Sequence, residues 1–359
     1  MKLLIAGGGT GGHVFPALAI AKEWLSRPEK NGKREVVLVG TQRGMESKLV
    51  PEAGLPLETL RVAGLKGISG MKFVRNVAML APGFWDAAQI LRRHRFAAAF
   101  GVGGYAAGPM MLMAVLRRIP TVIFEPNAEP GFTNRVLAGM VTRVATAYEA
   151  PAKRWGRKAM QTGCPVRREF FECPPAAPRR PIRLLITGGS QGALPVNRAV
   201  VGALDLLAAR KNELCIVHQA GERDYDAVRV AYARREINAQ VVPFLTNMPE
   251  RFAQTDLIVC RAGAITTAEI AAAGRAAIFI PFGASTDSHQ LRNAQVMVRA
   301  GAGRLIAETE LTPQRLAGEI FSLLDRPAQI VELSARARSL ARPNAARDIV
   351  NLIEEVARP

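Results

Sequence analysis

The stretch that decides the fold opens the chain: residues 2–13 read KLLIAGGGTGGH. Its apolar first half runs into a glycine-rich turn, and a helical pattern follows from near Pro16. A strand, a glycine turn and a helix in this order begin a nucleotide-binding βαβ unit, in which glycines let backbone N–H groups approach a phosphate closely. These residues therefore predict an α/β domain that binds a phosphorylated ligand.

The same signal returns at the middle of the chain. Residues 183–189, RLLITGG, resemble residues 2–8, and a second helical pattern follows from near Val196. Further apolar runs alternate with helical patterns, as parallel strands buried on both faces should. These runs are residues 35–39, 97–102, 121–124, 214–219, 257–260 and 276–281. We expect two doubly wound α/β domains, each built on a parallel sheet.

The length of the chain agrees with two domains, because 359 residues exceed what one hydrophobic core usually covers. We expect a first domain over residues 1–163 and a second over residues 164–342, with the linker near residues 162–166. A final helix is expected over residues 345–356, and residues 343–359 are expected to return to the first domain.

The composition is strongly basic, with 48 Lys and Arg against 30 Asp and Glu and a formal net charge of +18. A basic surface attracts nucleic acid, anionic lipid or phosphorylated substrates. Aromatic residues make up only 6% of the chain and do not alternate with basic ones as in a base-stacking platform, so we expect no nucleic-acid partner. The four cysteines lack metal-ligand spacing, which predicts no metal site and is typical of a reducing cytosol.

One segment imitates a membrane span. Residues 96–116 carry no charge and reach about the length of a bilayer-crossing helix, but glycines and a proline interrupt them in the middle. A buried strand, a glycine turn and a helix explain this pattern better. The apolar run of residues 3–6 is too short for a secretory signal, so we expect a soluble chain.

A nicotinamide-dependent enzyme is the alternative that the first loop raises, because Gly7, Gly9 and Gly12 satisfy G-x-G-x-x-G. That fingerprint also needs an acidic residue near the end of the second strand, where residues 39–43 read VGTQR. His13 follows the loop directly, where a cofactor-binding helix would normally pack. Neither strand is followed by a P-loop. Both alternatives are therefore disfavoured.

Three glycine loops instead point to one ligand site: residues 7–13, 103–105 and 188–192. Ligands of open α/β sheets bind beyond the carboxyl ends of the strands, so two such domains facing each other enclose a cleft. Backbone N–H groups and helix N-termini at these loops can stabilise a diphosphate leaving group. A diphosphate can therefore be stabilised without a metal, and we expect neither a metal nor another cofactor.

Five segments stand in order along the chain: GGTGGHVFPA (residues 8–17), GGYAAGP (103–109), GGSQGA (188–193), CRAGAITTAEIAAAG (260–274) and DSHQLRNA (287–294). Together they resemble the MurG family, the N-acetylglucosaminyltransferases that make lipid II for peptidoglycan. The resemblance runs from Met1 nearly to the C-terminus.

The resemblance implies a GT-B fold of two Rossmann-like domains with a cleft between them. It also implies a UDP-N-acetylglucosamine-dependent hexosyltransferase that inverts the anomeric centre. The acceptor that the resemblance implies is lipid I, undecaprenyl-diphospho-muramoyl-pentapeptide, and the implied products are lipid II and UDP. The first domain is then the acceptor and membrane side, and the second binds the UDP-sugar.

The resemblance also implies substrate contacts at matching positions. Ser190 would hold a diphosphate oxygen, the Leu245 backbone would meet the uracil edge, and Glu269 would accept the ribose hydroxyls. Gln290 would bind a sugar hydroxyl. The full set of implied binding residues is Thr10, Gly11, Gly12, Tyr105, Asn127, Arg167, Ser190, Gln191, Leu245, Ala264, Ile265, Thr266, Thr267, Ala268, Glu269 and Gln290.

Two residues are catalytic candidates. His13 follows the phosphate-type loop, and a neutral imidazole near physiological pH can take the proton from the acceptor hydroxyl. A loop carboxylate is the other possible base, which makes Glu125 the second candidate; for Glu125 and Tyr105 a purely structural role stays open. The chain also departs from the family where residues 124–127 read FEPN, against the family's His-Glu-Gln-Asn, and where His289 replaces a glutamine.

The segment of residues 65–95 predicts attachment to the cytoplasmic face of the cell membrane. Its apolar residues at near-helical spacing are Phe73, Val74, Val77, Leu80, Phe84 and Trp85, and its basic residues are Lys66, Lys72, Arg75, Arg92, Arg93 and Arg95. Apolar insertion and attraction to an anionic membrane surface reinforce each other in such a patch. The alternative is that these apolar residues face the core of the domain. Pro82-Gly83 is expected to interrupt the helix.

Other functions remain open at this point. A UDP-sugar epimerase or a GT-B transferase with another lipid acceptor would share the two-domain cleft. A non-enzymatic nucleotide-sugar sensor would keep the donor site and lose the acceptor chemistry. His94 and His218 are expected to be structural.

Overall fold

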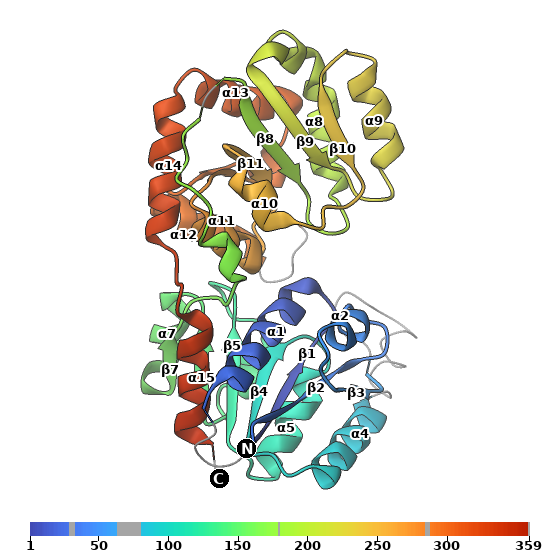
Figure 1. The fold of residues 1–359 in the computed structure, drawn as a ribbon, viewed down its shortest axis with the longest axis vertical. Coiled ribbons are helices and arrows are strands. Elements are labelled where there is room, and N and C mark those ends of the chain that lie inside the picture. Colours follow the sequence, from blue (N-terminus) through green and yellow to red (C-terminus); the bar gives the residue numbers. More distant parts are fainter. Residues whose placement is uncertain (29–32, 63–79, 179, 284–287, 358–359) are drawn as a thin grey trace. The chain divides into compact units, whose positions relative to one another are not determined.

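The computed structural model describes residues 1–28, 33–62, 80–178, 180–283 and 288–357. The chain divides into two compact units. Unit 1 comprises Met1–Val166 and Asn344–Pro359, and unit 2 comprises Arg167–Pro343. Figure 1 shows the elements of both units.

Unit 1 is built on a parallel sheet of seven strands. They are β1 (Lys2–Gly7), β2 (Glu35–Thr41), β3 (Leu57–Leu60), β4 (Ala98–Gly103), β5 (Thr121–Glu125), β6 (Arg143–Thr146) and β7 (Ala159–Gln161). Their order across the sheet is β3-β2-β1-β4-β5-β6-β7. The direction of the order reverses between β1 and β4, and the crevice beyond the carboxyl ends of these two strands is where such sheets bind ligands.

Helices cover both faces of this sheet. They are α1 (Gly11–Ser26), α2 (Glu46–Glu52), α4 (Leu80–Arg93), α5 (Ala107–Leu116), α6 (Phe132–Leu137), α7 (Glu149–Trp155) and α15 (Ala345–Val356), with a short 3-10 helix at Gly156–Lys158. α1 packs against α2 and α15, and α5 packs against α4 and α6. The apolar residues of α4, α5 and α6 form one core with the strands beneath them.

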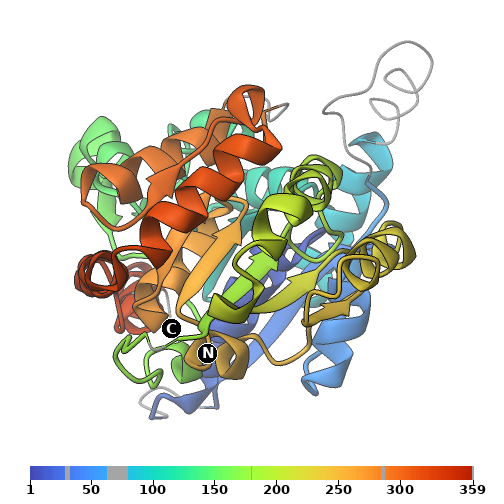
Figure 2. The same ribbon diagram turned by 90° about the horizontal axis from the view of Figure 1, so that it is seen from above.

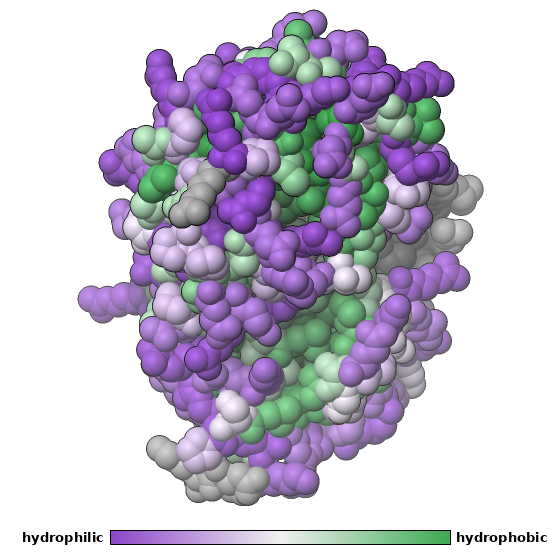
Figure 3. Space-filling model, turned by 45° about the horizontal axis from the view of Figure 1, so that its top comes forward, coloured by the Kyte–Doolittle hydropathy of each residue, from purple (hydrophilic) through white to green (hydrophobic). Residues whose placement is uncertain are grey.

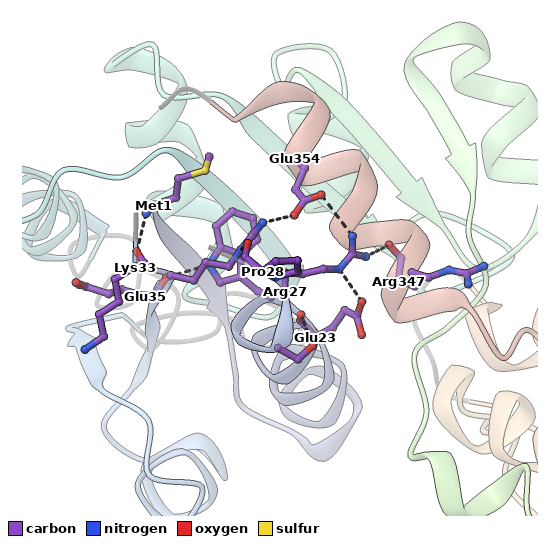
Figure 4. A network of polar contacts seen from close by, with 11 residues as sticks. Met1, Glu23, Arg27, Pro28, Lys33, Glu35, Arg347 and Glu354 are labelled. Carbon is purple, nitrogen blue, oxygen red and sulfur yellow. Dashed lines mark hydrogen bonds and ion pairs between the residues drawn. The ribbon is translucent and has the colours of Figure 1, made fainter. Parts of the chain in front are cut away.

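The last helix belongs to unit 1 although it follows unit 2 in sequence. Its apolar residues Ile349, Val350, Leu352 and Ile353 are buried, and it lies beside α1 (Figure 1). Arg27 forms an ion pair with Glu354 at 3.4 Å (Figure 4), and Arg34 forms another with the same carboxylate at 2.6 Å. Apolar packing and these ion pairs together hold α15 on the sheet.

Unit 2 repeats the architecture with six parallel strands. They are β8 (Ile182–Thr187), β9 (Leu214–Gln219), β10 (Ala239–Val242), β11 (Leu257–Cys260), β12 (Ala276–Phe279) and β13 (Arg304–Leu305). The order is β10-β9-β8-β11-β12-β13, so the reversal here lies between β8 and β11.

The helices of unit 2 lie on both faces of its sheet (Figures 1 and 2). They are α8 (Leu194–Ala208), α9 (Tyr225–Ala233), α10 (Met248–Ala253), α11 (Ala264–Ala273), α12 (His289–Arg299), α13 (Pro313–Leu324) and α14 (Pro327–Ser339), with 3-10 helices at Arg168–Phe170, Lys211–Glu213 and Glu308–Glu310. α8 packs against α9 and α13, and α11 packs against α10, α12 and α14.

The predicted fold class is confirmed: each unit is a parallel sheet flanked by helices. All the predicted strands are present, and the predicted final helix matches α15. The segment of residues 96–116 is β4, a glycine turn and α5, as expected. Within the described part of the chain, no helix combines the length and the apolar character that a membrane crossing requires.

Two predicted helix boundaries are wrong. α1 begins at Gly11, five residues before Pro16, so the end of the glycine loop is already the first helical turn. Pro82 and Gly83 do not interrupt a helix; they lie in the first turn of α4. The backbone N–H groups of a first turn have no partner in the helix, so a proline there costs little.

The predicted membrane patch is only partly visible. Lys66, Lys72, Phe73, Val74, Arg75 and Val77 lie outside the described residues. Within the described part, Trp85 is 60% exposed on α4, Phe84 is half-buried, and Arg92, Arg93 and Arg95 are exposed nearby. Figure 3 shows a mostly hydrophilic face, on which hydrophobic residues form smaller patches between the polar ones.

Candidate functional site

The first glycine loop leads from β1 into the start of α1. Thr10 is the N-cap of this helix, and its carbonyl accepts hydrogen bonds from His13 N (3.0 Å) and Val14 N (3.2 Å). Gly11 and Gly12 are the first two residues of the helix, so their N–H groups precede its first internal hydrogen bonds. The first turn carries no acidic side chain. Such a helix N-terminus attracts an anion through free N–H groups and its dipole. The geometry suits the expected phosphate contact of Thr10, Gly11 and Gly12.

His13 lies at the meeting point of two glycine loops. Its ring packs against the second loop so closely that a Cβ on Gly103 would lie 3.0 Å from two ring atoms. Its Nδ1 is 3.4 Å from Thr10 Oγ1. Burial lowers the pKa of His13, while a hydrogen bond with the Gly8 backbone and the charge of Glu46 oppose the decrease. A lowered pKa keeps the imidazole neutral at physiological pH, as a general base requires.

The second glycine loop follows β4 and packs directly on the first. Gly103 and Gly104 have φ angles of +102° and +85°, which side chains rarely adopt. A Cβ on Gly104 would lie 2.3 Å from the Gly8 carbonyl oxygen, so only glycine permits this contact. Tyr105, which follows, is 50% exposed and therefore accessible to a ligand.

A buried carboxylate that we did not predict supports the first loop. Glu46, at the start of α2, is 1% exposed and accepts a hydrogen bond from Gly9 N at 2.7 Å. Thr41 N and Thr41 Oγ1 donate to its other oxygen, both at 2.8 Å. A dinucleotide site would have its ribose-binding acid at residues 39–43. The acid lies a few residues later and is directed at the loop.

Glu125 lies at the end of β5 and is 1% exposed. Its Oε1 accepts hydrogen bonds from Asn127 N (2.9 Å) and Asn127 Nδ2 (3.1 Å). Its Oε2 accepts from Gly131 N (3.0 Å) and Asn134 Nδ2 (2.9 Å). Burial raises the pKa of Glu125, and these four hydrogen bonds oppose the increase.

Because both oxygens of Glu125 hold its own loop, the geometry favours a role in positioning Asn127 over direct proton transfer. The buried Asn134 completes this loop and was not singled out in the sequence. Its position, in the first turn of a short helix after a proline-glycine pair, gave no signal of such a contact.

The glycine loop of unit 2 lies between β8 and α8. Ser190 and Gln191 are exposed at its tip, as residues that contact a ligand must be. Gln219 fixes the base of the loop: its Nε2 donates to the Gly189 carbonyl at 3.0 Å, and its Oε1 accepts from Thr187 Oγ1 at 2.9 Å. Gln219 was not predicted as part of the site.

The α11 helix begins beyond the carboxyl end of β11, next to the reversal in strand order. Gly263 is its N-cap, and no acidic residue lies in its first turn. The expected phosphate-binding residues Ala264, Ile265 and Thr266 form that turn and are half-buried, as is Ala268. Thr267 is buried, and its hydroxyl donates to the Gly263 and Ala264 carbonyls at 3.2 and 2.9 Å.

Glu269 lies one turn further along α11 and is half-buried. Burial raises the pKa of Glu269 to about 7, and the charge of Arg167 opposes the increase. A carboxyl group held from water in this way gains from a ligand that brings hydrogen-bond donors. Arg167, at the start of unit 2, has its guanidinium 5.1 Å from the centre of the Phe170 ring.

Two further expected donor contacts of unit 2 lie in α12 and in the connection from β10 to α10. Gln290, in the first turn of α12, accepts a hydrogen bond from Phe282 N at 3.0 Å. Leu245 has a buried side chain between β10 and α10, which fixes the backbone expected to meet uracil. Arg261 was not predicted; it is buried and donates to the Ile280 and Pro281 carbonyls at 3.1 and 3.2 Å. Asp287, part of the family pattern, lies outside the described residues.

The two histidines expected to be structural lie away from these loops. His218 is buried in β9, with Nε2 3.1 Å from Asn197 Oδ1 and Nδ1 3.3 Å from the Tyr232 hydroxyl. Burial lowers the pKa of His218 to about 4. His94 Nε2 is 3.3 Å from Glu58 Oε1 at the end of α4.

Comparison with known proteins covers nearly the whole chain. Residues 3–146 match the model of the glycosyltransferase family 28 N-terminal domain, and residues 183–352 match that of the family 28 C-terminal domain. Two curated relatives are named UDP-N-acetylglucosamine–N-acetylmuramyl-(pentapeptide) pyrophosphoryl-undecaprenol N-acetylglucosamine transferase. That of Pelobacter propionicus is 41% identical over 98% of this chain and 99% of its own length. That of Solibacter usitatus is 41% identical over 100% of this chain and 97% of its own length.

Solved structures give the same picture. The crystal structure of Acinetobacter baumannii MurG matches with a TM-score of 0.77 and 31% identity, covering 99% of both chains. A UDP-GlcNAc 2-epimerase from Neisseria meningitidis, bound to UDP-GlcNAc, matches with a TM-score of 0.70 over 99% of this chain and 100% of its own, at 13% identity. The second likeness shows a shared fold alone.

Proposed function

The chain belongs to glycosyltransferase family 28 and, within it, to the MurG family, and we infer from this that it transfers N-acetylglucosamine from UDP-GlcNAc to lipid I, giving lipid II and UDP. The observation that carries this function is the 41% identity, over 98% of the chain, to the Pelobacter propionicus relative, whose name describes this transfer. Each unit also presents a glycine loop beside a helix N-terminus at the reversal of its strand order, which suits a ligand that carries phosphates.

The donor site is proposed in unit 2. The N-terminus of α11 (residues 264–268) and the loop carrying Ser190 and Gln191 would receive the diphosphate. Glu269 would accept the ribose hydroxyls, and Leu245 would meet uracil through its backbone. Gln290 would bind the sugar. The exposure of the loop tip and the raised pKa of Glu269 support this arrangement, as does a first turn of α11 that carries no acidic side chain. For Arg167 and Asn127 the family pattern is the main support.

The acceptor side is proposed in unit 1. The acceptor hydroxyl attacks the anomeric carbon of the donor sugar, the bond from that carbon to UDP breaks, and His13 takes the hydroxyl proton. The lowered pKa of His13 supports its assignment as the base. The positive helix end at Thr10, Gly11 and Gly12 would hold a phosphate, and Tyr105 would contact the acceptor. We assign Glu125 to positioning, because its own loop occupies both of its oxygens.

Attachment to the cytoplasmic face of the membrane is part of the proposal. The acceptor named for the relatives carries undecaprenol, a long apolar chain that partitions into a bilayer. Exposed Trp85 and the exposed arginines at the end of α4 offer an apolar group and positive charge on one unit.

The deciding experiment combines radiolabelled UDP-GlcNAc with a lipid I analogue. Label in the lipid fraction, appearing only when both substrates are present, is the expected result. Donor binding without labelled lipid would refute the transferase assignment and indicate a nucleotide-sugar sensor. An epimerised sugar nucleotide formed without acceptor would instead indicate an epimerase.

A further inference from the structure

The Glu46 carboxylate lies behind the first glycine loop, between that loop and the end of β2. It receives three hydrogen bonds, one from Gly9 N and two from Thr41. Hydrogen bonds to an ionised group are short and stronger than those between neutral groups. One of the three ties the middle of the glycine loop to the start of α2.

Three glycines surround this carboxylate and leave the space that it occupies. A Cβ on Gly8 would lie 2.2 Å from Glu46 Oε1, and a Cβ on Gly44 would lie 2.0 Å from Glu46 Oε2. A Cβ on Gly40 would lie 2.4 Å from Glu46 Cγ. None of these glycines has a positive φ, so space for the acid, not backbone conformation, excludes a side chain there.

The anchored loop leads directly to His13. Gly9, held by Glu46, is followed by Thr10, which caps α1 and places its hydroxyl 3.4 Å from His13 Nδ1. Gly8, on the other side of Gly9, hydrogen-bonds with His13 through its backbone. A shift of Gly9 therefore moves both neighbours of the imidazole.

We propose that Glu46 is a positioning residue for the transfer reaction: its carboxylate fixes the first glycine loop in the form that orients the His13 imidazole. This inference rests on the assignment of His13 as the base in the proposed function. The same carboxylate acts through its charge. The Gly8 backbone and Glu46 both raise the pKa of His13 against burial, while the second glycine loop contributes backbone at Gly103.

The test compares Glu46→Gln with Glu52→Gln, which removes an exposed carboxylate from the same helix. An amide presents a donor where Gly9 N or Thr41 already donates, so the loop loses one anchor. Glu46→Gln is expected to lower kcat by about ten- to a hundredfold, with the KM for UDP-GlcNAc changed less than about twofold. The Glu52→Gln control should retain both values.

A second readout does not depend on turnover. The chain has four histidines, so the ring resonance of His13 can be assigned by its absence from a His13→Ala spectrum and titrated by NMR. Loss of the Glu46 charge should move the titration midpoint of His13 to lower pH. Glu46→Asp keeps the charge but withdraws it by one methylene, so it should show a smaller shift in the same direction and an intermediate kcat.

The outcomes are distinct. An unchanged His13 titration and kcat in folded Glu46→Gln overturn the proposal, as does a loss of thermal stability with no change in the titration. Should Glu46→Gln fail to fold, Glu46→Asp decides alone, and a wild-type midpoint in it overturns the proposal. If the wild-type protein transfers no sugar, the proposed function fails, but the NMR titration still tests whether Glu46 sets the state of His13.

Discussion

Donor binding should depend on pH through Glu269. Burial raises the pKa of this carboxyl group to about 7 from its ordinary value of 4.5. If the ribose hydroxyls donate to Glu269, they favour its ionised form, and the bound state has a lower pKa than the free state. Near neutral pH, UDP-GlcNAc must then displace a proton from those protein molecules in which Glu269 is protonated.

The magnitude follows from the two pKa values. At pH 7 a group with a pKa of about 7 is half protonated, so about half a proton should leave per donor bound if binding restores an ordinary pKa. Between pH 6 and pH 8 the protonated fraction of the free protein falls almost to zero, and the Kd should decrease by about tenfold. The sign is fixed: affinity rises with pH and levels off above about pH 8.

Isothermal titration calorimetry measures both effects. UDP-GlcNAc is the right ligand, because the terminal phosphate of UDP itself titrates near pH 6. Repeating the titration in buffers with different ionisation enthalpies gives the number of protons released. Glu269→Gln should abolish the release and flatten the pH dependence. A wild-type Kd that is constant from pH 6 to 8, or an equal slope in the glutamine variant, would refute the assignment of Glu269 to the ribose.

Three further predictions concern other parts of the site. His13→Ala should lower kcat by roughly 10²–10⁴ and change the donor KM far less, in steady-state assays with His94→Ala as the surface control; a change confined to KM would make His13 a binding residue. Gln219→Ala removes the hydrogen bond to Gly189 and should weaken UDP-GlcNAc binding by about 1–2 kcal/mol in calorimetry. Gln240→Ala, on the next strand, should leave the affinity unchanged. Equal affinities of the two variants would show that Gln219 does not support the loop. Trp85→Ser should reduce co-sedimentation with anionic vesicles by about tenfold relative to Val331→Ser, and undiminished binding would exclude Trp85 as an anchor.

The sequence was sufficient to predict those elements whose residue pattern lies within one short stretch of chain. Residues 2–8 and 183–189 each carry a whole strand and its glycine turn, so both domains could be recognised. Five strands were not predicted, because they are short and lie at or near sheet edges, where few apolar residues are needed: β3, β6, β7, β10 and β13. Helix starts were displaced for a related reason: a glycine turn and a first helical turn have similar composition but different backbone.

The supporting residues of the site could not be predicted. Glu46, Gln219 and Asn134 act through contacts with loops that are distant or irregularly spaced in sequence. A carboxylate or amide on the sequence looks the same whether it faces water, a substrate or a backbone N–H group. Glu125 shows the difficulty: its match to the family pattern suggested chemistry, while its partners show that it holds its own loop.

The return of α15 to unit 1 has a consequence for the order in which the chain is completed during synthesis. Unit 2 is wholly translated before the helix that closes unit 1 leaves the ribosome. Until then, the surface of α1 that α15 covers is open to solvent or to a chaperone. Domains generally fold as units during translation, and in this chain all residues of the later unit are synthesised before those of unit 1 are complete. A fragment that stops at residue 166 contains both glycine loops of unit 1 but lacks the helix that packs on α1 and on the sheet.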